Sequence, residues 1–209
     1  MADRTRSTPR RPVRRSVKPK SPADQGRAPR QRMVLAAAAL LSERGLAGAS
    51  FSEVIERSGA PRGSIYHHFP EGKDRLAAEA IELVGGHVLG LLRQGEGATP
   101  RQVVHRFVDA WRAVLVKSDC NAGCAIAAVA NERLEHPELA ARAAAVFVAW
   151  ERELKERLVA AGMPRAKAGR AASLILAAVE GALILCRARR EIGPLDAVED
   201  ALVRGIAKS

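Results

Sequence analysis

Residues 50–76 read SFSEVIERSGAPRGSIYHHFPEGKDRL, and this stretch predicts two short helices joined by a tight turn. Ser50 and Glu53 make a capping box for the first helix, and Gly59 supplies the turn. A second, very short helix is expected over residues 62–68, before Phe-Pro-Glu-Gly breaks the chain. This pattern is typical of a helix-turn-helix, whose second helix lies in the major groove of DNA.

The exposed face of the second short helix offers side chains that can donate hydrogen bonds to phosphate oxygens or reach base edges. Lys73 begins the next helix, where free backbone N–H groups already favour a phosphate. Phe69, in contrast, is expected to pack inside, because an apolar ring gains more from burial than from DNA contact. The predicted DNA contacts are Arg62, Gly63, Ser64, Tyr66, His67, His68 and Lys73.

Beyond this stretch, the chain has a helical pattern nearly throughout. Ala and Leu are abundant from residue 30 onward, apolar residues recur at spacings of three and four, and no run alternates with period two. We therefore predict an all-α fold. Helices are expected at residues 29–44, 50–58, 62–68, 73–93, 99–118, 124–132, 137–161, 164–190 and 194–207, with a loop at 94–98. The predicted parts are a disordered tail (1–28), a helix-turn-helix domain (29–72) and a larger helical domain (73–209).

The charge is strongly basic and unevenly distributed. The chain has 34 Lys and Arg against 23 Asp and Glu, a net charge of +11, which suits a polyanionic partner such as nucleic acid or an anionic membrane surface. Most of the excess lies in residues 1–30, among several prolines and few apolar residues. This tail is either a basic arm that adds phosphate contacts or a solvated extension upstream of a start at Met33.

Several features point away from a secreted protein, a membrane protein or an enzyme. Three cysteines and the lack of an apolar run before Met33 indicate a reduced, cytoplasmic chain. We expect a buried helix at residues 171–186 and no membrane contact, because the apolar run is shorter than about 18 residues and contains Glu180. Cys120 and Cys124 alone are too few for a structural zinc site. No nucleophile beside a base and no Gly-rich phosphate loop is present, so we expect neither an enzyme nor a cofactor.

The helix-turn-helix stretch resembles the DNA-binding segment of the TetR family of bacterial regulators. The family hallmark, Tyr-x-His-Phe with a following Lys, is present as Tyr66, His68, Phe69 and Lys73. The Phe-Pro-x-Gly-Lys linker is one residue longer than the commonest family form and is similar to the branch containing the LmrA and YxaF repressors. Residues 123–130 and 180–187 resemble the same branch.

The resemblance implies a cytoplasmic repressor that binds palindromic double-stranded operator DNA as a homodimer and is released by a small hydrophobic or drug-like effector. Residues 73–209 would then form a ligand-sensing and dimerisation domain, with the last two helices in the dimer interface. The apolar helix near residues 171–186 agrees, since a helix without a polar face must be covered on every side. Aromatic residues at helical spacing can line an apolar pocket or simply form core. The candidate effector contacts are His105, Phe107, Trp111, Phe147 and Trp150.

Two other classes of function fit parts of the sequence. A non-sensing architectural DNA-binding protein would use the basic tail as its main affinity element, and would give no palindrome-specific footprint. A membrane-surface or scaffold protein with a chance motif would not bind DNA at physiological salt.

Overall fold

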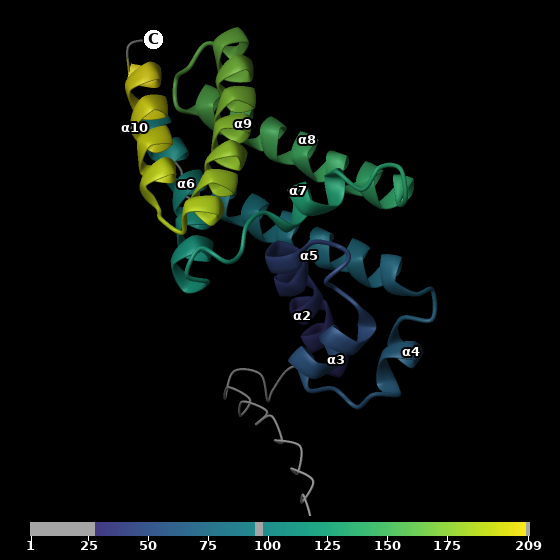
Figure 1. Ribbon diagram of the computed structural model, residues 1–209. Helices are drawn as coiled ribbons and strands as arrows, with labels where there is room; N and C mark the ends of the chain where they lie inside the picture. Colours follow the sequence, from purple (N-terminus) through teal and green to yellow (C-terminus); the bar gives the residue numbers. More distant parts are fainter. Residues whose placement is uncertain (1–27, 95–97, 208–209) are drawn as a thin grey trace, which may run out of the picture.

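The computed structural model describes residues 28–94 and 98–207, so nearly all of the predicted tail and part of the 94–98 loop lie outside the described residues. These residues form helices and no strand, which confirms the all-α prediction (Figure 1). The helices are α2 (Pro29–Arg44), α3 (Phe51–Ser58), α4 (Ser64–His68), α5 (Lys73–Arg93), α6 (Pro100–Lys117), α7 (Ala125–Ala130), α8 (Pro137–Ala160), α9 (Arg165–Arg189) and α10 (Gly193–Ala207).

Local sequence signals account for most helix ends. Thr99 and Gln102 form a complete capping box at α6, with Pro100 in the first turn. The predicted box at α3 is only half formed. The Ser50 hydroxyl accepts the Glu53 backbone N–H, but the Glu53 carboxylate pairs with Arg44 at 3.2 Å instead of turning back.

Helix α4 is shorter than predicted. It begins at Ser64 rather than Arg62, because Pro61 to Gly63 form a turn that the Ser64 backbone N–H closes on Pro61 O at 3.0 Å. The helix therefore has five residues. The first two predicted DNA contacts, Arg62 and Gly63, lie in the turn before it.

Helices α2, α3 and α4 form a small unit at one end of the molecule (Figure 1). Val54, Ile65 and Phe69 are buried in its core, and the Arg30 guanidinium lies over the Phe69 ring, 5.1 Å from the ring centroid. Gly59 adopts the left-handed conformation (φ 60°) that the tight turn requires. The prediction that Phe69 packs inside is confirmed.

Helix α5 connects this unit to the rest of the chain. It packs on α2 near its start and on α8 along its length. Gly85 permits the close crossing with α8, since a Cβ at that position would lie 2.8 Å from Val146 Cγ1, and the Trp150 indole donates to Gly85 O at 3.0 Å. One hydrophobic core runs through both parts, and the domain boundary at residue 72 stays a prediction.

Helices α9 and α10 pack together at the end of the molecule opposite α3 and α4 (Figure 1). Among the described residues, α9 is the one helix long and apolar enough to cross a membrane by length and composition, yet a third of its most apolar window is buried in the chain. The prediction of a buried helix is therefore correct for one face only. Leu174, Ile184 and Leu185 point to solvent, because no other helix of the described chain covers them.

Candidate nucleic-acid interface

Tyr66 is the large exposed side chain of α4. It is 67% exposed, although it is the largest residue of α4. The Phe51 ring of α3 packs against it edge to face, with ring centroids 5.6 Å apart. This contact fixes the orientation of the Tyr66 ring and leaves its hydroxyl available to a phosphate.

The other predicted DNA contacts surround Tyr66 on the turn, on α4 and at the start of α5. Arg62, Gly63 and His67 are exposed, whereas Ser64, His68 and Lys73 are half-buried. The structure thus brings all seven predicted residues to one short segment of surface.

Two of these residues have local geometry that bears on their role. The Ser64 hydroxyl donates to Pro61 O at 2.7 Å, so its proton is already used within the turn. A Cβ placed at Gly63 would meet nothing within 4 Å. Packing therefore does not require a glycine there, and its bare backbone can approach a phosphate closely.

Ion pairs fix the unit behind this surface. Arg57 donates two hydrogen bonds to the Glu43 carboxylate, at 2.6 and 2.7 Å, joining the end of α3 to α2. The hydrogen bond from Arg57 lowers the pKa of Glu43, and the same bond raises the pKa of Arg57. Sequence analysis missed this pair because its members are 14 residues apart, on different helices.

The candidate effector contacts fall into two groups. Phe107, Trp111, Phe147 and Trp150 form an aromatic cluster between α6 and α8, with Trp111 and Trp150 centroids 5.8 Å apart. Trp111 Nε1 is buried and has no hydrogen-bond partner among the described residues. An unpaired buried donor is costly, and the cluster around it is closely packed, with Phe107, Trp111 and Trp150 at most 3% exposed.

His105 lies apart from the aromatic cluster. Its Nδ1 contacts Glu199 of α10, and its Nε2 accepts from Arg101 at 3.0 Å. Arg112 joins the same group by pairing with Asp196 and, at 2.5 Å, with Glu199. This charged group joins α6 to α10. The sequence position of His105 did not indicate that it pairs with Glu199.

The cysteines are free and buried, and among the described residues no three potential metal ligands gather. The Cys124 thiol lies against the Glu180 carboxylate of α9, and burial raises the pKa of Cys124. Burial also raises the pKa of Glu180 to about 7, although the hydrogen bond from Cys124 opposes this. One carboxylate oxygen of Glu180 is buried without a partner among the described residues.

Comparison with known protein families gives matches over both halves of the chain. Residues 34–80 match the family described as bacterial regulatory proteins, tetR family. Residues 100–201 match the C-terminal domain of LmrA/YxaF-like transcriptional regulators.

Individual proteins of similar sequence are also described as transcriptional regulators. The chain is 40% identical, over 180 residues, to an uncharacterised HTH-type transcriptional regulator of Mycobacterium tuberculosis, covering 83% of this chain and 92% of the relative. It is 27% identical to YxaF of Bacillus subtilis, covering 79% and 88% of the two chains.

Solved structures share the fold. A TetR transcriptional regulator from Legionella pneumophila superposes with a TM-score of 0.79 at 21% identity, covering 87% of this chain and 98% of the other. The TetR family regulator CifR, solved in complex with 26-base-pair operator DNA, gives a TM-score of 0.68 at 19% identity, covering 83% and 94%.

Proposed function

Because the chain belongs to the TetR family of DNA-binding transcriptional regulators, we propose that it is a repressor released from DNA by a ligand. It binds a palindromic operator in the cytoplasm as a homodimer, and a small hydrophobic effector releases it. The observation that carries the homodimer, and with it the palindromic operator, is the exposed apolar face of α9, which lies far from the recognition helix and has no partner within the described part of the chain.

That face has the pattern of a helix-helix interface. Apolar residues recur at spacings of three and four along its exposed side, and small residues between them allow a second helix to approach closely. The stripe consists of Leu174, Ala177, Ala178, Gly181, Ile184 and Leu185. A second copy of the chain would cover it with the same stripe through a two-fold axis.

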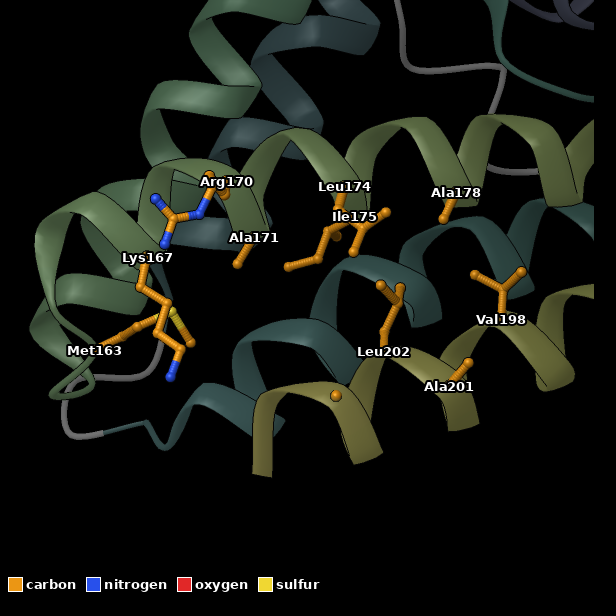
Figure 2. Close-up of a pocket in the computed structure, with 11 residues that line it drawn as sticks. Met163, Lys167, Arg170, Ala171, Leu174, Ile175, Ala178, Val198, Ala201 and Leu202 are labelled. Carbon is orange, nitrogen blue, oxygen red and sulfur yellow. The ribbon is translucent and has the colours of Figure 1, made fainter. Parts of the chain in front are cut away.

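A groove beside the stripe supports the same interface. It lies between α9 and α10, has a volume of about 450 Å³ and is lined mostly by apolar side chains, with Leu174 and Ile175 facing Leu202 (Figure 2). Lys167 and Arg170 lie at one end. A surface of this kind is unfavourable in water, and a partner helix packed along it would remove it from solvent.

A dimer through α9 presents two recognition helices to the same side of DNA. Two-fold symmetry makes the preferred site a palindrome with half-sites about 34 Å apart, one turn of the double helix. In each half, Arg62, Tyr66, His67 and Lys73 make the main contacts, while Gly63 contributes through its backbone and Ser64 and His68 through less exposed side chains.

We place the effector at the aromatic cluster of α6 and α8. An apolar molecule with a hydrogen-bond acceptor would pack against Phe107, Phe147 and Trp150 and accept a hydrogen bond from Trp111 Nε1. His105, which pairs with Glu199 apart from the cluster, would affect such a site only through α6, the helix that it shares with Phe107 and Trp111. Binding that favours the wrong separation of the recognition helices shifts the population away from the operator-bound state.

The test has two steps with the full chain. Selection from a random duplex library should recover a palindromic sequence, and hydrophobic compounds that change tryptophan fluorescence should release the selected duplex. Trp111→Phe keeps an aromatic ring and removes Nε1. This variant should need more effector to release the duplex and should bind the operator as the wild-type protein does. Recovery of no common sequence, or release by none of a broad panel, would favour a non-sensing architectural protein.

A further inference from the structure

The end of α2 is completed by groups from the C-terminal part of the chain. The last carbonyls of a helix have no partner within the helix. Gly123 N, in the segment before α7, donates to Ser42 O at 2.9 Å. Arg187 Nη2, near the end of α9, donates to Glu43 O at 2.8 Å. Two orphan carbonyls of the DNA-binding unit are therefore satisfied from outside it.

Gly123 and Arg187 also contact each other. A Cβ at position 123 would lie 2.9 Å from Arg187 Cδ, so the glycine leaves the space through which the arginine side chain passes. The segment before Gly123 is held firmly. Asp119 and Cys120 both adopt left-handed backbone angles (φ 51° and 56°), and the Cys120 N–H donates to Leu115 O at 2.8 Å. Such a conformation persists only where the surroundings fix it.

Glu43 extends this connection to the helix-turn-helix. Its carbonyl accepts from Arg187 of α9, and its carboxylate accepts two hydrogen bonds from Arg57 at the end of α3. The positive charge of Arg187 also lies at the negative end of the α2 dipole. Charge-assisted contacts thus run without a break from α9 to the helix that precedes the recognition turn.

We propose that Gly123 and Arg187 form a cap that fixes the direction of α2, and with it the recognition helix, relative to α9. Arg187 is then a positioning residue for operator binding. This inference rests on the proposed dimer through α9, because only a dimer converts the direction of α2 into a distance between two recognition helices. Loosening the cap widens the range of half-site separations that the dimer accepts and lowers its affinity for the preferred one.

The first test is Arg187→Ala in the full chain. The probes are the operator selected by the wild-type protein and versions with one or two base pairs added or removed between the half-sites. Affinity for the selected operator should fall about threefold to tenfold, as expected for one exposed charge-assisted hydrogen bond, while affinity for the altered spacings should change little. Arg189→Ala removes the same charge from the same helix, where the side chain pairs only loosely with Glu191 (3.8 Å), and should keep wild-type discrimination.

The second test, Gly123→Ala, keeps every charge and pushes the Arg187 side chain aside with one methyl group. This variant should also discriminate less between operators with different half-site spacings. If Arg187→Ala does not fold, Gly123→Ala alone tests the cap. Wild-type discrimination in folded dimers of Arg187→Ala, or of Gly123→Ala in its place, would overturn the cap. Failure of the wild-type protein to select any two-part operator would instead overturn the proposed function, and the cap with it.

Discussion

Glu180 is a buried carboxylate whose ionisation opposes folding. Its pKa of about 7 lies above the ordinary value of 4.5, so the folded chain holds a proton that the unfolded chain loses between these pH values. The free energy of unfolding therefore falls as pH rises through this range. We predict that Glu180→Gln stabilises the protein by about 1–3 kcal/mol at pH 8 and has little effect at pH 4.5.

Thermal unfolding of both proteins across this pH range measures the effect. Glu156→Gln is the matched control, because its carboxylate forms an exposed pair with Arg165 at 3.1 Å. A gain from Glu180→Gln that is equal at both pH values would show that the pKa of Glu180 is the same in the folded and the unfolded chain.

Lys73 is predicted to contact a phosphate rather than a base. Lys73→Ala should therefore weaken binding to operator and unrelated DNA alike, and should flatten the dependence of log affinity on log salt by about one for each phosphate that the variant no longer neutralises. Fluorescence anisotropy at several salt concentrations measures both quantities. Lys155→Ala removes the same charge from α8, away from the predicted DNA contacts, and should leave the salt dependence unchanged. If the wild-type protein and both variants show the same salt dependence, Lys73 does not contact a phosphate.

At the scale of the helix, the two faces of α9 call for different experiments. Leu183 is buried within its own chain at 2% exposure, so a charge there would unfold the protein and reveal nothing about the dimer. Ile184 is 68% exposed. We predict that Ile184→Glu gives a folded monomer with an unchanged helical circular dichroism spectrum and at least about tenfold weaker operator binding.

Val148→Glu provides the control for this variant. Val148 is 64% exposed on α8, so it receives the same charge outside the proposed stripe. Sedimentation should find this control as a dimer. A dimeric Ile184→Glu protein would place the interface elsewhere.

The sequence predicted the helices well, because their ends depend on local residues. Pro100, Pro137 and the Thr99 capping box act within one turn, and the structure confirms the helices that they begin. Contacts between distant residues were not predictable in this way. Neither the Arg187 cap on α2 nor the pairing of His105 with Glu199, 94 residues away, leaves a local pattern. Family membership confirms a DNA-binding regulator rather than an enzyme.

At the scale of the whole molecule, the recognition helix precedes the start of α5, the proposed effector site lies beside the middle of α5, where Trp150 contacts Gly85, and one core joins the two. If they are coupled, saturating operator must weaken effector binding by the same factor by which saturating effector weakens operator binding. We predict equal factors of about 5 to 150, the usual range for allosteric coupling. Tryptophan fluorescence titrations with and without operator measure the first factor, and anisotropy titrations with and without effector measure the second. Effector affinity that ignores operator would contradict the coupling.

The exposed stripe of α9 also has a consequence for synthesis on the ribosome. Helix α9 follows α2 to α8 in the chain, so the surfaces of α6 and α8 on which it packs are made before it, and only α10 is added later. Its 25 residues take roughly one to five seconds at about 5–20 residues per second. This exposed apolar surface is thus added late, when most of the described fold has been made, and in the proposed dimer it stays uncovered until a second chain packs on it.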